Sequence, residues 1–365
     1  MNLDPGKIAS SQLSFLVIGF LIGSSVLFPP GTFAGNAAWA TVLVGASIGL
    51  LYLYIYIKLI NKYPGKTIVE INEDILGVYL GKLFSFLYLL YFFHLGALVL
   101  RNFGDGYKIF LTKTPVEVIM LTFILLSAYA IKSGIEVIGR TTGFFILIIF
   151  FIIIMDTILV YRMVEIERLL PMFDISVKKF LQISFAASAF PFAEIVVFLM
   201  IVGFVNKQKE TGKALIVGYI VVVGYLLLVA IRNVAVLGPL VTVEKYPSLM
   251  VVRLIDVAEV FTRIDVLVAF IIVIVAFVKI TICYYATVLG VAQVTKMQTY
   301  KPLTLPIGIL MLILAIIQFD NVAENINFAI DVYPYYALLF QFILPFLTLI
   351  IGYIRKFPGA ETLND

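Results

Sequence analysis

Long apolar runs alternate with short polar stretches along the whole chain. Ten of these runs approach the ~20 residues that an α-helix needs to cross the hydrocarbon core of a bilayer. No polar stretch between them is long enough for a soluble domain. We therefore predict an all-α polytopic membrane protein, a single domain over residues 1–365, with transmembrane helices at about residues 12–34, 38–59, 83–107, 115–132, 141–161, 181–205, 214–238, 266–293, 303–319 and 333–354.

The composition supports a membrane protein and argues against several other classes. Apolar residues make up 62% of the 365 residues and charged residues 13%, whereas soluble proteins are roughly 45–50% apolar. A single cysteine, Cys283, cannot form a disulfide within the chain or a thiolate metal cluster. The sequence has neither a Walker loop nor a His-Glu-x-x-His motif, and no basic stripe with interleaved aromatics. We therefore expect no enzyme activity, cofactor, bound metal or nucleic-acid partner.

Two of the runs are interrupted in the middle. The first contains Gly-Ser-Ser-Val-Leu-Phe-Pro-Pro-Gly at residues 23–31, and the sixth contains Pro191 within residues 188–194. Proline lacks the amide that would continue the helix, and interrupted helices at matching places in two halves mark the substrate site of many secondary transporters. The backbone groups freed there suit a small zwitterion, since amides attract a carboxylate and carbonyls an ammonium. The candidate ligand-binding residues are Gly23, Ser24, Ser25, Ser188, Ala189 and Phe190.

Counting the runs also predicts how the two halves are related. The halves at about 12–161 and 181–355 each hold five runs and begin with an interrupted one. Because five is odd, the second half enters the membrane from the opposite side, which makes a 5+5 inverted repeat with interrupted helices 1 and 6. The loops on the side of the termini carry more lysine and arginine, so both termini are expected on the cytoplasmic side.

Two ionisable residues fall deep inside apolar runs, where a charge costs from about 2.5 kcal/mol upward. Glu194 either bonds backbone groups freed by Pro191 or titrates a proton beside the unwound segment. Lys279 either occupies a cation position near the first break, in place of a coupling sodium ion, or forms a structural ion pair with Glu194. These two residues are our candidates for ion or proton coupling.

Two further polar residues are candidates for the ligand site. His94 lies in the third run among aromatic residues, as a hydrogen-bonded packing residue or as part of a polar site. Thr287 shares a helical face with Lys279, a small and polar stripe that suits a hydrated wall. Short amphipathic helices are predicted at residues 65–80 on the inner surface and at 247–263 on the outer one.

Four motifs carry a resemblance to a known family. They are Thr114-Pro115, the stretch at residues 133–140 (Ser-Gly-Ile-Glu-Val-Ile-Gly-Arg), Leu169-Leu170-Pro171, and Tyr246-Pro247 running on to Arg263-Ile264-Asp265. In their order and spacing the chain resembles the spore germination permease family, the B subunits of bacterial spore germinant receptors. That family is similar to permeases of the amino acid-polyamine-organocation superfamily, which share the LeuT-type inverted repeat.

The resemblance implies a function as well as a fold. It implies a subunit in the inner membrane of a dormant spore that contacts membrane lipid, binds a small amino acid-like germinant and triggers germination together with A and C subunits. Two other functions stay open: a proton-coupled amino acid permease that transports its ligand, and a subunit that scaffolds its partners or conducts ions.

Overall fold

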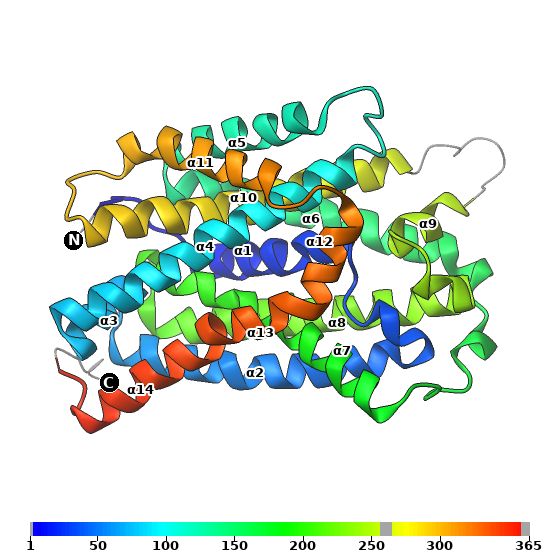
Figure 1. Cartoon of the computed structure of the whole chain (residues 1–365), viewed down its shortest axis with the longest axis horizontal. Helices are drawn as coiled ribbons and strands as arrows, with labels where there is room; N and C mark the ends of the chain where they lie inside the picture. Colours follow the sequence, from blue (N-terminus) through cyan, green and yellow to red (C-terminus); the bar gives the residue numbers. More distant parts are fainter. Residues whose placement is uncertain (1–2, 256–264, 359–365) are drawn as a thin grey trace.

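The computed structural model describes residues 3–255 and 265–358, and within these ranges the chain is helical without a named β-strand. Most helices run roughly along the long axis of the molecule, with α1 in the interior (Figure 1). The α-helices are α1 Ser10–Ile22, α2 Ala38–Lys62, α3 Ile68–Leu76, α4 Val78–Tyr107, α5 Val116–Ser133, α6 Ile135–Val160, α7 Val177–Ala189, α8 Thr211–Leu237, α9 Pro247–Arg253, α10 Asp265–Val294, α11 Thr304–Ile317, α12 Val322–Asn327, α13 Tyr333–Leu338 and α14 Leu344–Ile354.

Eight helical stretches in the described ranges are long and apolar enough to cross a membrane. Two shorter apolar stretches, Ser10–Val26 and Lys301–Ile317, coincide with the first and ninth predicted runs. The prediction of an all-α integral membrane protein is thereby confirmed for the described residues. The count of ten spans and the inverted repeat stay predictions.

The first apolar segment is interrupted where the glycine, serines and prolines predict it. Helix α1 ends at Ile22, and a 3₁₀ turn over Gly23–Val26 follows. Pro29 and Pro30 then prevent a return to helical hydrogen bonding, and Gly31 takes a left-handed conformation with φ of 80°. A Cβ at Gly31 would lie 2.5 Å from the Thr41 hydroxyl oxygen, so only glycine fits this turn.

The sixth segment is interrupted in the same way. Helix α7 ends at Ala189, Phe190 is extended, and a 3₁₀ stretch over Phe192–Met200 continues the segment beyond Pro191. That stretch packs against α2, α10 and α1. The two breaks therefore lie within one packed interior.

The last segment begins earlier than predicted. It is helical from Val322, whereas the apolar pattern placed its start near residue 333. The Asn321 side chain accepts a hydrogen bond from the Glu324 amide and caps α12, and a polar first turn hides this start from hydropathy. Two π-helical stretches, Phe328–Val332 and Leu339–Ile343, follow, and the segment bends between α12 and α13 (Figure 1). Such π-helical turns are frequent at functional sites.

The two predicted amphipathic helices have different outcomes. Helix α3 forms within 65–80: Thr67 and Glu70 cap it reciprocally, and Gly77 ends it. Helix α9 begins at Pro247 as predicted and ends at Arg253. The remainder of the predicted outer helix, from residue 256 onward, lies outside the described residues.

Candidate functional site

The two predicted interior charges contact each other. The Nζ atom of Lys279, on α10, lies 2.5 Å from Oε2 of Glu194, just beyond the break in the sixth segment. Lys279 is completely buried and Glu194 is 2% exposed. The ammonium also lies 4.9 Å from the ring centroid of Phe190 and 5.2 Å from that of Phe20, within cation–π range. The site is thus built on an ion pair of zero net charge.

The break in the first segment makes room for this lysine. A Cβ at Gly23 would lie 2.5 Å from Cδ of Lys279 and 3.2 Å from its Cβ. Close approach of this kind requires glycine. Gly23, predicted as a ligand-binding residue, therefore packs against the stem of the lysine.

A chain of hydrogen bonds leads away from the other oxygen of Glu194. The Tyr333 hydroxyl donates to Oε1 of Glu194 at 2.7 Å and lies 2.9 Å from the Tyr91 hydroxyl. Gln341 donates from Nε2 to the Tyr91 hydroxyl at 2.8 Å and to the carbonyl of Ala189 at 3.0 Å. The third, sixth and last segments are connected in this way to the backbone at the sixth break.

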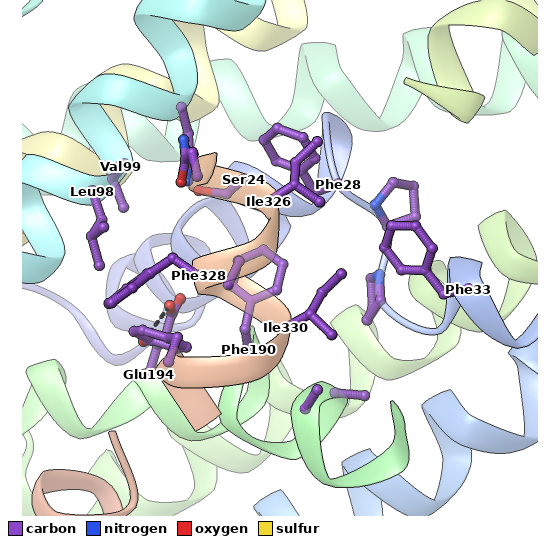
Figure 2. Close-up of a pocket in the computed structure, with 18 of the residues that line it drawn as sticks. Ser24, Phe28, Phe33, Leu98, Val99, Phe190, Glu194, Ile326, Phe328 and Ile330 are labelled. Atoms are coloured by element: carbon purple, nitrogen blue, oxygen red, sulfur yellow. Dashed lines mark hydrogen bonds between the residues drawn. The ribbon is translucent and has the colours of Figure 1, made fainter. Parts of the chain in front are cut away.

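A cavity of about 120 Å³ lies beside the ion pair, between the two breaks and the last segment (Figure 2). Ser24, Phe190 and Glu194 are the predicted residues that line it. The other lining residues come from the turn after the first break, from α4, α7 and α12, and from the first π-helical stretch and its end: Phe28, Pro29, Pro30, Gly31, Phe33, Leu95, Leu98, Val99, Asn102, Ile183, Ala186, Ala187, Asn325, Ile326, Phe328, Ala329, Ile330 and Tyr333.

Few polar groups face the cavity. The Ser24 hydroxyl is fully buried and has no hydrogen-bond partner among the described residues. Asn325 donates from Nδ2 to Oδ1 of Asn102 at 2.6 Å. Glu194 and Tyr333 complete the polar set. An unpartnered buried hydroxyl is costly unless something binds it, so Ser24 is a candidate donor to a ligand.

The remaining predicted ligand residues are buried or half-buried nearby, but they do not line the cavity. The Ser25 hydroxyl donates to the Leu21 carbonyl at 3.1 Å and the Ser188 hydroxyl to the Phe185 carbonyl at 2.7 Å. Ala189 contributes the backbone carbonyl that accepts from Gln341. Their side chains are occupied locally, and their roles in binding stay predictions.

His94 and Thr287 lie behind the cavity wall. His94 Nδ1 is 3.2 Å from the Tyr336 hydroxyl, and its ring packs edge-on against Phe328, which lines the cavity. Thr287 donates to the Cys283 carbonyl one turn back on α10. Both side chains therefore support neighbouring groups in this conformation.

A buried carboxylate that the sequence analysis overlooked holds the N-terminal segment. Asp4 accepts hydrogen bonds from the Gly6 amide at 2.8 Å, the Ile135 amide at 3.1 Å, the Tyr285 hydroxyl at 2.9 Å and the Tyr300 hydroxyl at 3.0 Å. Burial and the neighbouring carboxylate raise the pKa of the Tyr300 phenol, so this hydroxyl stays protonated and donates. We call these four hydrogen bonds the Asp4 cluster.

Backbone hydrogen bonds also hold the N-terminal segment, in addition to the Asp4 cluster. The Ile8 amide donates to the Phe204 carbonyl at 2.9 Å, and the Asn206 amide donates to the Ile8 carbonyl at 3.0 Å. The stretch before α1 is thereby bridged to the end of the sixth segment. The cavity, by contrast, is lined by the turn after the first break, so it lies towards the opposite end of the first segment.

Comparison with solved structures defines the class of protein. The chain resembles Mhp1, a nucleobase-cation-symport-1 family transporter in a closed conformation with bromovinylhydantoin bound, with a TM-score of 0.73 at 11% identity over 96% of this chain and 79% of that one. It also resembles MhsT in complex with L-phenylalanine, with a TM-score of 0.63 at 12% identity over 95% of this chain and 99% of that one. The fold is that of the LeuT-like membrane transporters.

Sequence comparison then identifies the family. The sequence profile described as spore germination protein matches residues 7–323. The chain is 32% identical over 363 residues to spore germination protein KB of Bacillus subtilis (strain 168), covering 97% of this chain and 96% of that protein. It is 27% identical over 358 residues to spore germination protein YndE of the same strain, covering 96% and 97%. The chain belongs to the spore germination protein family.

Proposed function

We propose that the chain is the germinant-sensing membrane subunit of a spore germinant receptor, which binds a small amino acid-like ligand in the cavity beside Glu194 and thereby triggers germination. The observation that carries this proposal is the cavity itself. It lies between two helix breaks and is lined by the Glu194 carboxylate and by a buried Ser24 hydroxyl that has no hydrogen-bond partner among the described residues.

The polar groups suit both ends of a zwitterion. The Ser24 hydroxyl donates to the ligand carboxylate. A carboxylate has about four lone-pair sites, and Glu194 uses two of them, for Lys279 and Tyr333. The unused sites accept from the ligand ammonium. The ligand ammonium is itself charged, so this added bond is charge-assisted.

Ligand binding is communicated through Tyr333. A ligand shifts a conformational equilibrium only by binding one state more tightly than the other. The ligand ammonium shares the Glu194 carboxylate with the Tyr333 hydroxyl and so changes the bond that Tyr333 donates, and Tyr333 is connected through Tyr91 and Gln341 to the sixth break. The hydrogen-bond chain therefore differs between the empty and the occupied subunit.

The alternative is a proton-coupled amino acid permease. The LeuT-like fold favours it, as does a buried Glu194 that could carry a proton across. In both functions Lys279 holds the cation position near the first break, and the subunit lies in the inner spore membrane with both termini on the cytoplasmic side. If the chain is a germinant sensor, its partners are the receptor A and C subunits and membrane lipid.

Uptake and binding measured in parallel distinguish the two functions. We expect a pooled mixture of amino acids to stabilise the purified chain against thermal unfolding, with no saturable uptake into vesicles that contain it. Ser24→Ala should weaken this stabilisation. Ser47→Ala, which removes a lipid-side hydroxyl bonded only within α2, should not. Saturable uptake would support the permease, and the absence of any stabilisation would exclude ligand binding.

A further inference from the structure

We infer that the connection between α6 and α7 lies in the headgroup region of the membrane and binds anionic phospholipid. This connection, residues 161–176, joins the two helices at the end of the molecule opposite the N-terminus (Figure 1). It contains Leu169-Leu170-Pro171, one of the motifs that carry the family resemblance, and none of these three residues lines the cavity. The inference concerns the surface of the molecule and is independent of the proposed ligand.

Large apolar side chains face away from the protein along this connection. Ile166, Leu170 and Phe173 are 69%, 61% and 61% exposed. They lie between two apolar stretches that are long enough to cross a membrane, so they belong to neither of them. Exposed apolar groups of this kind mark a surface that a membrane or another protein covers.

Polar groups of the same connection face the protein. The Arg168 side chain pairs with Glu165 at 2.6 Å and donates to the Val236 carbonyl near the end of α8. Asn36 donates from Nδ2 to the Pro171 carbonyl at 3.3 Å. These bonds hold the connection against the protein while its apolar side chains point outward. A loop that faces water would show the opposite arrangement, with its polar side chains outward.

The irregular backbone sets the depth of the connection in the membrane. Short 3₁₀ turns over Tyr161–Met163 and Ile166–Leu169 are separated by extended residues. Irregular backbone exposed to lipid does not occur within the hydrocarbon, because its amides and carbonyls would lack partners. In the hydrated headgroup region these groups bond to water, and apolar side chains still reach the ends of the acyl chains.

Continuity with two neighbouring surfaces favours lipid over a protein partner. On α6, Phe151 and Ile158 are exposed, and Tyr161 continues this face into the connection. On α7, Val177 and Leu181 are exposed. Both helices belong to stretches apolar enough to cross a membrane, so their exposed apolar faces contact lipid. The connection leaves one lipid-facing surface and enters another, and lipid therefore covers it as well.

Basic side chains at the edges of the connection favour anionic lipid. Arg162, Lys178 and Lys179 are exposed, and the exposed carboxylates of Glu167 and Asp174 only partly balance them. Basic residues beside an apolar interfacial segment attract anionic headgroups. The apolar side chains thus hold the connection at the membrane surface, and the adjacent lysines enrich anionic phospholipid around it.

A tryptophan placed in the connection reports what surrounds it. Trp39 is the one tryptophan of the chain, so Trp39→Phe combined with Leu170→Trp gives a single-tryptophan protein. In nanodiscs, lipids brominated near the headgroup should quench it at least about twofold more than a tryptophan introduced by Lys113→Trp in the same background. Lys113 is exposed in the polar connection between α4 and α5.

Aqueous iodide should show the reverse order, with the tryptophan at position 113 quenched more strongly. Both replaced side chains are exposed, so both variants should fold. Equal or reversed quenching by brominated lipid would overturn the inference and leave the surface to water or to a protein partner.

Brominating one lipid of a mixture tests the role of the lysines. We expect brominated phosphatidylglycerol to quench the Leu170→Trp protein at least about twofold more than brominated phosphatidylcholine at the same mole fraction. Adding Lys178→Gln and Lys179→Gln should abolish this difference. Adding Lys108→Gln and Lys113→Gln, which removes the same charge from the connection between α4 and α5, should not. Equal quenching by the two lipids, or a preference that survives loss of Lys178 and Lys179, would overturn the binding of anionic phospholipid.

Discussion

At the scale of single residues, the fully buried Lys279 depends on Glu194. The ion pair joins α10 to the sixth segment, and the lysine stem fills the space that Gly23 leaves. Removing one partner of a buried pair leaves the other charge uncompensated, which costs more than the pair contributes. The site is therefore sensitive to single changes and tolerant of paired ones.

A double-mutant comparison measures this dependence. Lys279→Met should lower the free energy of unfolding by about 3–5 kcal/mol, because Glu194 is left buried without a counter-charge. The double variant with Glu194→Gln should recover most of that loss. Denaturant unfolding of the purified protein in detergent is the measurement. A single variant as stable as the unmodified chain would contradict this dependence of Lys279 and Glu194 on each other.

Tyr333 should affect the germination response to the ligand more than it affects the affinity for the ligand. Tyr333→Phe removes the hydroxyl that bridges Glu194 and Tyr91. We expect the ligand concentration for half-maximal germination to rise about tenfold, within the 5–150-fold range of allosteric coupling. The dissociation constant of the purified chain should change less than about threefold.

Tyr336→Phe is the matched control. This hydroxyl bonds to His94 on the far side of the wall and does not reach Glu194. Germination with this variant should be close to normal. Equal defects in the two variants would assign the effect of Tyr333→Phe to packing and not to the hydrogen-bond chain.

Sequence predicted the charges of the site better than its hydrogen bonds. Glu194, Lys279 and Ser24 stand out because polar groups are rare at bilayer depth. Tyr333, Tyr91 and Gln341 do not, since tyrosine is common in apolar runs and the two partners in each of these hydrogen bonds lie at least 139 residues apart in the sequence. Asp4 was missed because it precedes the first apolar run.

At the scale of elements, the 3₁₀ turn at Gly23–Val26 lets α1 end against α10. Its serines could be recognised from sequence as a helix interruption, but the contact with Lys279 could not. The π-helical stretches of the last segment could not be predicted either, because an extra residue per turn leaves no regular apolar period. Proline interrupts a helix through its own covalent structure, which the sequence shows. A π-helical turn depends on how neighbouring segments pack, which the sequence does not show.

Gly23→Ala tests this close approach. The added Cβ would meet a lysine side chain that the ion pair holds in place, so we expect a loss of about 1–3 kcal/mol, as for other overpacked sites. Gly224→Ala in α8 is the control, because nothing lies within 4 Å of its added Cβ. It should be neutral or slightly stabilising through helix propensity. Thermal unfolding in detergent compares the two. Equal stability would mean that Lys279 can move aside.

At the scale of the whole molecule, hydrogen bonds to Asp4 anchor the N-terminal segment at the end where α1 begins, and the cavity beside Glu194 lies towards the other end of the first segment. The Asp4 cluster connects the N-terminal segment to α6, α10 and the stretch before α11. Apolar composition and run length predicted the fold class. They could not predict how the N-terminal segment is anchored, because that depends on contacts between residues up to 296 positions apart.

Asp4→Asn should loosen the N-terminal segment. Hydrogen bonds to a charged group contribute roughly 1.5–3 kcal/mol each, and an amide offers one acceptor oxygen in place of two. We expect amide hydrogen exchange over residues 6–9 to rise at least about tenfold. Asp74→Asn, which breaks only a half-exposed ion pair with Lys66, should leave this segment unchanged. Unaltered exchange in Asp4→Asn would mean that the backbone pairing alone holds the segment.

The backbone bridge between Ile8 and the end of the sixth segment gives the start of the chain a mechanical role. Because Ile8 bonds through both its amide and its carbonyl to the Phe204–Asn206 stretch, any tilt of that end of the sixth segment would carry the residues before α1 with it. Anything that grips the exposed side chains of Pro5 or Lys7 therefore also holds the segment that carries Glu194. Binding at the residues before α1 would therefore restrain the position of the sixth segment inside the protein.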